Sequence, residues 1–266
     1  MPKAKQREPN RYETIILRLF ENHYTQGLTE FEFTRDEIES ISKILNIKLP
    51  KNIGDVIYTF RYRSKLPEKI QDTANPGLEW IILGAGNACY RFIQFKLNPI
   101  IPRDELVTIK IPDSTPEIIT AYALSDEQAL LAKVRYNRLV DVFLGITAFS
   151  LQNHLRTTVE SIGQIEIDEI YVGIDRYGRQ FIVPVQAKGG KDKHSVVQTL
   201  QDLTYCAEKF PDLICKAVSA QFMSEGRIAM FELLREGNEV KVVEEKHYRL
   251  VPSSDIYKED LRNYSR

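Results

Sequence analysis

Residues 164–188 read Gln164-Ile-Glu-Ile-Asp-Glu-Ile-Tyr-Val-Gly-Ile-Asp175, followed by Arg176-Tyr-Gly178 and Arg179-Gln-Phe-Ile-Val-Pro-Val-Gln-Ala-Lys188. Two runs rich in Ile and Val flank a short loop that ends in glycine, the residue that tolerates a positive φ. The pattern predicts a β-hairpin with a three-residue loop centred on Tyr177. Asp168 and Gln186 are each nine residues from this centre, and Glu166 and Lys188 are each eleven, so each pair lies opposite across the hairpin.

Strand alternation places these four side chains on one face of the hairpin, while Glu169 and Asp175 point to the other face. Two carboxylates, an amide and an ammonium thus meet within strands that are otherwise apolar. Burying such groups costs several kcal/mol unless they are paired or bind a metal. A polar cluster in a core strand therefore indicates a functional site.

The chemistry of the cluster favours a divalent metal ion. Carboxylate and amide oxygens are hard ligands suited to Mg²⁺ or Mn²⁺, so Asp168 and Gln186 are the candidate ligands, with Glu166 as an additional acid. Lys188 is placed to position a water molecule or to stabilise a pentacovalent transition state. The set predicts phosphodiester hydrolysis. The alternative is a purely structural arrangement, an exposed sheet face on which Lys188 pairs with one of the acids.

The hairpin resembles the signature of the PD-(D/E)XK nuclease superfamily. Asp168 matches its first acidic position, and Gln186-Ala-Lys188 matches its second motif, with Gln in place of the usual Asp or Glu. The Q-x-K form is similar to Mrr-type restriction nucleases, which carry a winged-helix domain in front. The glycine pair and lysines that follow, up to Lys193, also fit this subgroup.

The resemblance implies a type II restriction endonuclease that uses Mg²⁺ (or Mn²⁺) to cut double-stranded DNA. It further implies a homodimer, because duplex cleavage needs two active sites, and a cognate DNA methyltransferase acting on the same sequence. The superfamily usually adds an acid from the helix before the sheet. The candidates are Asp141, Glu127 and Glu160, with Asn137 as a neutral option, and the sequence does not choose between them.

The first hundred residues predict a small DNA-binding domain. Helices are expected over residues 12–24, 34–45 and 50–63, the second with a capping box between Thr34 and Glu37, followed by a hairpin over residues 80–95. Three helices and a β-ribbon resemble a winged helix, whose third helix enters the major groove. Candidate DNA contacts on that helix and its end are Lys51, Asn52, Thr59, Arg61, Arg63 and Lys65, and Lys191 and Lys193 after the active strand are two more. The alternative is a packing domain with a solvated charged face.

The second half predicts an α/β (α+β) fold with a mixed sheet flanked by helices. A helix is expected over 126–143, strands over 148–159, 164–175 and 179–188, a helix over 194–209, and strands over 214–223, 227–235 and 240–251. The predicted domains are residues 1–103, winged-helix-like, and 125–266, catalytic. Residues 104–124 are expected as a proline-rich linker with one strand near 106–111.

Composition excludes several other classes of protein. The 266 residues are 43% hydrophobic, carry a net charge of −1 and contain no apolar run long enough to span a membrane. The polar N-terminus and three unpaired cysteines without metal-ligand spacing indicate a cytoplasmic protein. Two alternatives stay open beside the restriction nuclease: a non-enzymatic DNA-binding regulator, and a repair or junction nuclease on the same fold.

Overall fold

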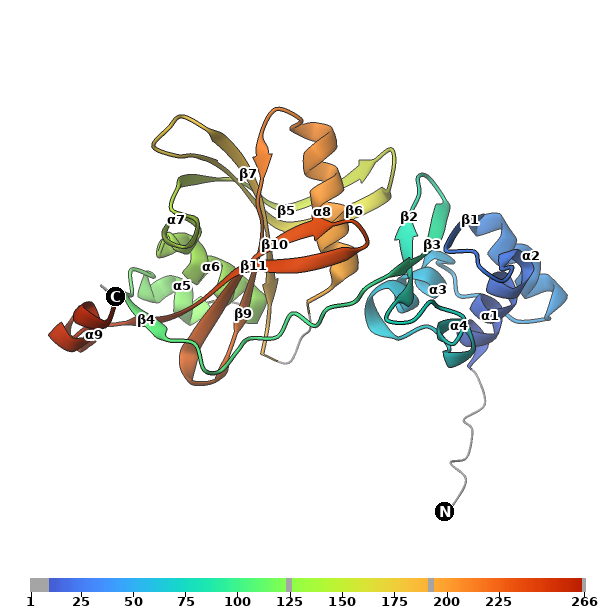
Figure 1. Cartoon of the computed structure of the whole chain (residues 1–266), viewed down its shortest axis with the longest axis horizontal. Helices are drawn as coiled ribbons and strands as arrows, with labels where there is room; N and C mark the ends of the chain where they lie inside the picture. The colour runs from blue at the N-terminus through green and yellow to red at the C-terminus, as the bar shows by residue number, and fades with distance from the viewer. Residues whose placement is uncertain (1–9, 123–125, 191–193, 265–266) are drawn as a thin grey trace, which may run out of the picture. The chain divides into compact units, whose positions relative to one another are not determined.

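The structure is a computed structural model, and it describes residues 10–122, 126–190 and 194–264. The chain divides into two compact units (Figure 1). The first unit comprises the residues up to Leu97 together with Thr158–Gln164, and the second comprises Asn98–Thr157 and the residues from Ile165 onward. The expected domain boundaries stay a prediction, although part of the expected linker forms a strand in the sheet of the second unit.

The first unit combines short helices with a three-stranded antiparallel sheet in the order β1-β3-β2. Its elements are α1 (Arg11–His23), β1 (Glu30–Thr34), α2 (Arg35–Ile44), α3 (Gly54–Tyr58), the π-helical turn η1 (Thr59–Arg63), α4 (Glu68–Gln71), β2 (Glu79–Gly84) and β3 (Cys89–Phe95). The capping box is confirmed, since the Thr34 amide donates to Glu37 Oε1 at 2.8 Å. The core is aromatic, with Phe20, Phe92 and Trp80 packed edge to face.

Two local predictions for this unit were wrong. The third helix begins at Gly54 rather than at Pro50, because the Asn52 side chain accepts a hydrogen bond from the Gly54 amide and holds the preceding turn out of the helix. The strand β1 was not expected, although Phe31 and Phe33 alternate with charged residues along it. It pairs with β3 along its whole length.

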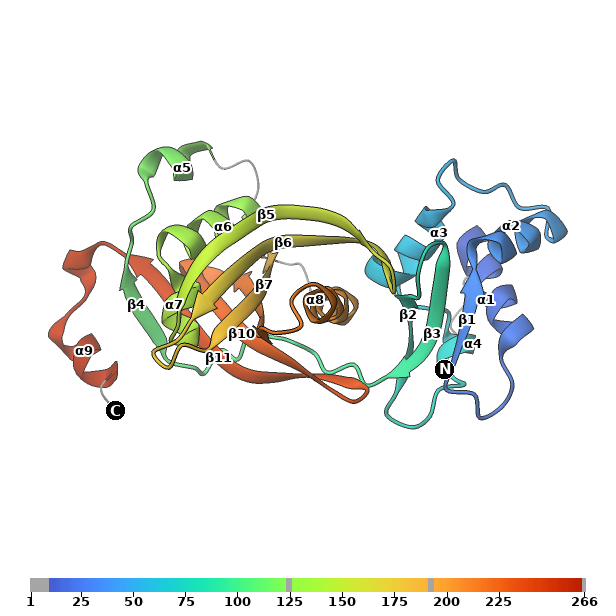
Figure 2. The same cartoon turned by 90° about the horizontal axis from the view of Figure 1, so that it is seen from above.

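The second unit is built on an eight-stranded mixed sheet (Figure 2). Seven strands follow in the order β4-β11-β10-β9-β7-β6-β5, and the short β8 pairs with β7. The strands are β4 (Thr108–Pro112), β5 (Thr147–Val159), β6 (Gly163–Ile174), β7 (Gln180–Lys188), β8 (Ile214–Cys215), β9 (Ala217–Phe222), β10 (Arg227–Glu236) and β11 (Glu239–Val251). The predicted mixed sheet with flanking helices is confirmed.

Helices cover both faces of this sheet. On one face, α6 (Asp126–Tyr136) and α7 (Leu139–Leu144) pack their apolar side chains against Val183, Val185 and Ala187 of β7. On the other side of β7 lies α8 (Val196–Lys209), as Figure 1 shows. The short helices α5 (Glu117–Tyr122) and α9 (Lys258–Tyr264) complete the unit. In the part of the chain that the structure describes, no helix is long and apolar enough to cross a membrane.

The single helix expected over 126–143 was wrong in one respect, because it is broken into α6 and α7. Arg138 at the break has a left-handed backbone, with φ of 50°. The side chain of Asn137 leaves the helix to accept a hydrogen bond from the Ser114 amide at 2.6 Å. Tertiary bonding at Asn137 therefore overrides the helical periodicity at this point.

The hairpin register agrees with the prediction from Tyr177. Glu169 pairs with Val185, and every pair up to Ile174 and Gln180 keeps the same centre. The loop closes with a hydrogen bond from the Asp175 amide to the Arg179 carbonyl, and Gly178 takes a positive φ of 82°. Alternation then sets which side chains of β6 and β7 face α8.

Candidate functional site

Asp168 lies at the end of the paired part of β6, half-buried, on the face that α8 covers. Its Oδ2 accepts a hydrogen bond from the Ala187 amide at 2.8 Å, which ties the carboxylate to the neighbouring strand. Burial raises the pKa of Asp168, while the Ala187 hydrogen bond and the charge of Lys188 act in the opposite direction. The carboxylate is thus held beside β7 in a partly desolvated place.

Gln186 contributes the second polar group of the site. Its amide nitrogen Nε2 donates to Oδ2 of Asp202, on α8, at 2.7 Å, and both side chains are buried. The other end of the amide, Oε1, is buried and has no hydrogen-bond partner among the described residues. An unpartnered buried carbonyl oxygen costs free energy, which a bound cation would recover.

Asp202 completes the acidic side of the cluster. It lies within the field of Asp168, and burial raises its pKa well above the ordinary value, with the charge of Asp168 adding to the rise. The hydrogen bond from Gln186 and the charge of Lys188 act in the opposite direction. Two mutually repelling carboxylates in one buried place indicate a site built for positive charge.

Lys188, at the end of β7, is only 9% exposed. Its charge acts on Asp168, on Asp202 and on His194. The structure therefore brings three of the predicted residues, Asp168, Gln186 and Lys188, to one place. We refer to these three together with Asp202 as the α8-face cluster.

His194 stands next to the cluster, in a role that the sequence did not reveal. Its ring bonds two residues of β9: Nε2 faces Gln221 Oε1 at 3.0 Å, and Nδ1 contacts Ser219 Oγ. Burial lowers the pKa of His194 to about 4, so the imidazole is neutral at pH 7. A neutral ring that accepts from Ser219 and donates to Gln221 fastens the start of α8 to the sheet.

Glu166 has different neighbours from the other predicted residues. Its side chain is exposed on β6, where Oε1 lies 3.2 Å from Arg156 Nη2 and 3.5 Å from His154 Nδ1 on β5. The predicted pair of Glu166 with Lys188 falls outside the observed ladder between β6 and β7, which begins at Glu169 and Val185. A role for Glu166 as an additional acid stays a prediction.

The candidate acids from the first helices have other partners in the structure. Asp141 bonds Arg138 and the Ala148 amide at the other face of the sheet, and Asn137 anchors residues 113–115. Glu127 is exposed on α6, and Glu160 belongs to the first unit. Asp202 approaches the cluster instead, from the helix after the hairpin. The available signal was an acid on the buried stripe of that helix, one turn before the buried Cys206.

The predicted DNA contacts of the first unit lie on and around α3 and η1. Lys51, Asn52, Arg63 and Lys65 are exposed, and Thr59 and Arg61 are half-buried. Arg63 stacks on Tyr58 and Arg61 on Tyr62, with guanidinium-to-ring distances of 4.9 and 5.1 Å. A surface hollow is lined by Tyr12, Asn52, Asp55, Tyr58, Thr59 and Arg63. Lys191 and Lys193 lie outside the described residues.

The donor set of the α8-face cluster fits a hard divalent cation. Asp168 and the free Oε1 of Gln186 offer oxygen ligands, and Asp202 binds the opposite end of the Gln186 amide. No group of three or more His, Cys, Asp or Glu side chains suited to a metal occurs among the described residues, so a site here depends on the amide oxygen. Mg²⁺ typically keeps several waters and takes only one or two carboxylates, which agrees with so small a set.

Compared with known proteins, the chain matches no family model, no curated protein and no solved structure.

Proposed function

We propose that this chain is a Mg²⁺-dependent endonuclease that hydrolyses phosphodiester bonds in duplex DNA, as a type II restriction endonuclease does. The observation that carries the proposal is the α8-face cluster, where a buried amide oxygen with no hydrogen-bond partner among the described residues lies beside two carboxylates and one ammonium. A bound cation would satisfy this oxygen and match the negative charge of the carboxylates around it.

Asp168 and Gln186 Oε1 would hold the ion. When bound, a divalent ion lowers the pKa of a coordinated water and offsets negative charge on a phosphate. Asp202 acts as a positioning residue, because its bond to Nε2 fixes which end of the Gln186 amide is free.

Lys188 is the catalytic residue of the proposal. Its ammonium lies in the field of Asp168 and is nearly buried, so the charge is screened little by solvent. It would orient the attacking water and stabilise the charge that develops as one P–O bond forms and the other breaks. The leaving oxygen takes up a proton, so that each cut yields one phosphate end and one hydroxyl end.

The element order of the first unit supports DNA binding by α3. The element order α1-β1-α2-α3-η1-α4-β2-β3, with sheet order β1-β3-β2, is compatible with the winged-helix resemblance. The exposed basic and amide side chains of α3 and η1 provide donors for phosphates and base edges. A homodimer and a cognate methyltransferase are parts of the same proposal.

A plasmid assay tests the proposal. Supercoiled plasmid is incubated with the full chain in Mg²⁺ or EDTA, beside the variant Asp168→Asn and a matched control, Asp212→Asn, at an exposed aspartate. We expect nicked and linear products only in Mg²⁺, lost in Asp168→Asn and kept in Asp212→Asn. Absence of metal-dependent products from the folded chain on unmethylated, methylated and branched DNA would refute the proposal.

One observation favours a second candidate, the non-enzymatic DNA-binding regulator. The described residues hold no cluster of three acidic, His or Cys side chains suited to a metal, while the α3 surface would serve binding alone. The same assay separates the two functions: a regulator shifts labelled DNA in a gel and leaves plasmid intact in Mg²⁺.

A further inference from the structure

The sheet face that carries Lys188 continues across β9 to β10 and β11. Lys188 pairs with Gln221 of β9, Gln221 with Ala229 of β10, and Ala229 with His247 of β11. Side chains two residues further along β10 and β11 point to the same face. These are Arg227 and Arg249, which form the next row after that of Lys188.

Arg227 and Arg249 lie directly opposite each other in the antiparallel ladder. Like charges at paired positions destabilise a sheet, so the arrangement breaks a local rule. Glu232 and Glu244 also face each other, but there Lys216 bonds Glu232 and Lys246 lies 3.4 Å from Glu244. The acids that compensate the arginine pair, Asp104 and Glu225, both lie outside β10 and β11.

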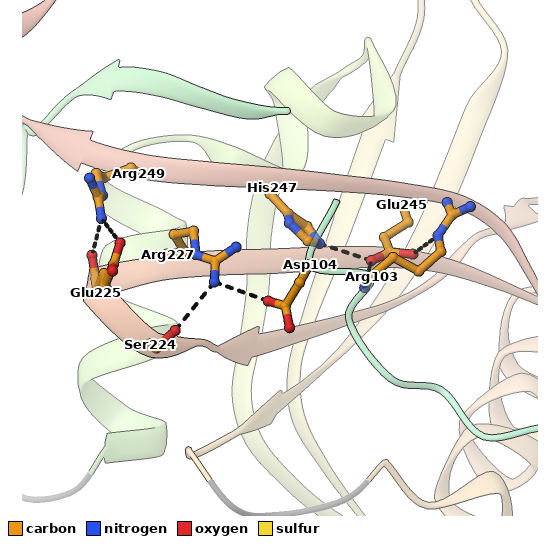
Figure 3. Close-up of polar contacts among 8 residues, drawn as sticks. All are labelled: Arg103, Asp104, Ser224, Glu225, Arg227, Glu245, His247 and Arg249. Carbon is orange, nitrogen blue, oxygen red and sulfur yellow. Dashed lines mark hydrogen bonds and ion pairs between the residues drawn. The ribbon is translucent and has the colours of Figure 1, made fainter. Parts of the chain in front are cut away.

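Each arginine retains a buried donor that no described residue accepts from. The Nε atoms of Arg227 and Arg249 are buried and lack a hydrogen-bond partner in the part of the chain that the structure describes. The neighbouring Glu245 is already occupied, since it accepts from Arg103 Nε at 2.7 Å and lies 2.8 Å from His247 Nε2 (Figure 3). Each guanidinium group therefore has an Nε donor that can still form a hydrogen bond.

The acids that contact the arginines come from exposed side chains outside the two strands. Arg227 Nη2 bonds Asp104, which is 82% exposed, at 3.1 Å, and Arg249 Nη2 bonds Glu225, which is 75% exposed, at 2.9 Å (Figure 3). Arg227 and Arg249 are only 16% and 35% exposed, but solvent screens both pairs through their exposed carboxylates, so each contributes little to stability. Another anion can replace both carboxylates at small cost.

We propose that Arg227 and Arg249 bind a backbone phosphate of the DNA strand whose cleavage is attributed to Lys188, with Asp104 and Glu225 occupying the place in the absence of DNA. The guanidinium fork matches a phosphate bidentately. Strand spacing and rise place the backbone of Arg227 roughly 12 Å from that of Lys188. The inference rests on the proposed function for the identity of the anion.

Binding of a labelled 30-base-pair duplex to the full chain in EDTA tests this inference, because no metal-dependent cleavage then interferes. The variant Arg227→Gln/Arg249→Gln is compared with Arg179→Gln/Arg235→Gln, which removes two arginines outside the row. We expect the first variant to bind at least 10-fold more weakly, with the slope of log K against log salt reduced by about one because one phosphate contact is lost, and the control to change less than 2-fold. Asp104→Asn/Glu225→Gln should bind more tightly than wild type.

Equal affinities and salt slopes for the two arginine variants would overturn the inference. Melting curves check that each variant is folded. If the glutamine variant does not fold, Arg227→Lys/Arg249→Lys keeps the charges without the fork, and unchanged affinity in that variant would overturn the bidentate contact.

Nicking in Mg²⁺ is measured in parallel and separates this inference from the proposed function. Arginine-dependent binding by a chain that never nicks DNA would refute the proposed nuclease and keep the phosphate site. If wild type nicks DNA but the arginine variant binds duplex as tightly as wild type, the phosphate site alone is refuted. If wild type does not bind duplex at all, both proposals are refuted.

Discussion

Glu169 and Asp168 are neighbours on β6, yet their side chains lie on opposite faces of the sheet. Glu169 faces α6, where Arg135 Nε lies 2.8 Å from its Oε1 and Ser150 Oγ donates to the same atom at 2.6 Å. Its Oε2 has no hydrogen-bond partner within the described residues, but a guanidinium matches its charge. This acid has the environment of a structural ion pair.

Asp168 faces α8 and has a different environment. A backbone amide, not an arginine, bonds its carboxylate, and a second acid, Asp202, acts on the same place. The free oxygen of Gln186 adds a further electronegative atom. The comparison teaches that burial of an acid alone does not mark a site, whereas a surplus of electronegative groups over matched cations does.

The largest expected effect concerns activity on the α8 face. Lys188→Ala should reduce plasmid cleavage about 1000-fold or more, because the ammonium would no longer stabilise the developing charge. Arg135→Ala, on the other face, should keep its cleavage rate at temperatures where it is folded. Lys246→Ala, at an exposed lysine of β11, is the matched control. Cleavage by Lys188→Ala at the wild-type rate would remove the catalytic assignment.

The next effect concerns stability on the α6 face. Arg135→Ala should lower the free energy of unfolding by about 3–5 kcal/mol, because the fully buried Glu169 would be left without a matching charge. Arg179→Ala, which breaks an ion pair at an arginine that is largely exposed, should cost less than about 1 kcal/mol. Urea denaturation measures both values, and equal losses would contradict a structural role for Arg135.

His194, at the start of α8, should make the free energy of unfolding depend on pH by up to about 3 kcal/mol. Because burial lowers the pKa of His194 to about 4, the unfolded chain binds more protons than the folded chain between pH 6.5 and 4. The free energy of unfolding therefore falls as the pH falls through this window. His194→Gln should remove this part of the slope, measured as the difference from wild type. If the difference in free energy of unfolding between wild type and His194→Gln did not change from pH 7 to pH 4, His194 would be an exposed, ordinary histidine.

Two matched acid-to-amide substitutions, one on each face of the sheet, should give the smallest changes in stability, and these changes should have opposite signs. Glu169→Gln should lower stability by about 2 kcal/mol, since it leaves Arg135 without a counter-charge. Asp202→Asn should raise it by about 1 kcal/mol at pH 7, because the buried charge is lost while Gln186 keeps an acceptor.

The sign for Asp202 follows from its raised pKa. Stability in the wild type decreases as the pH rises from the ordinary value of 3.8 through the folded pKa, and Asp202→Asn lacks this decrease. Destabilisation of Asp202→Asn as large as that of Glu169→Gln would mean that the two faces do not differ.

The hairpin could be predicted from the sequence because its signals are local. Period-2 alternation and one glycine set the register, and the register sets which polar side chains of β6 and β7 share a face. The same signals found Asp168, Gln186 and Lys188 without any tertiary information. Most strands of the second unit were also predicted within a few residues.

The remaining features depend on contacts between distant segments. Asp202 and His194 reach the site only because α8 packs on β7 and β9, a placement that no local pattern contains. The break at Arg138 results from the bond between Asn137 and Ser114, and the arginine row results from the pairing of β10 with β11. Glu166 lay at the right spacing, but its exposed side chain bonds Arg156.

Direct titration of a divalent ion tests the central claim, which is that the α8-face cluster is a cation site. Calorimetry with Mn²⁺ alone is run on the full chain, on Asp168→Asn and on Glu169→Gln. We expect saturable binding to wild type and to Glu169→Gln, weakened at least 10-fold in Asp168→Asn. Equal binding to wild type and Asp168→Asn, or no saturable binding to the folded wild type, would contradict it.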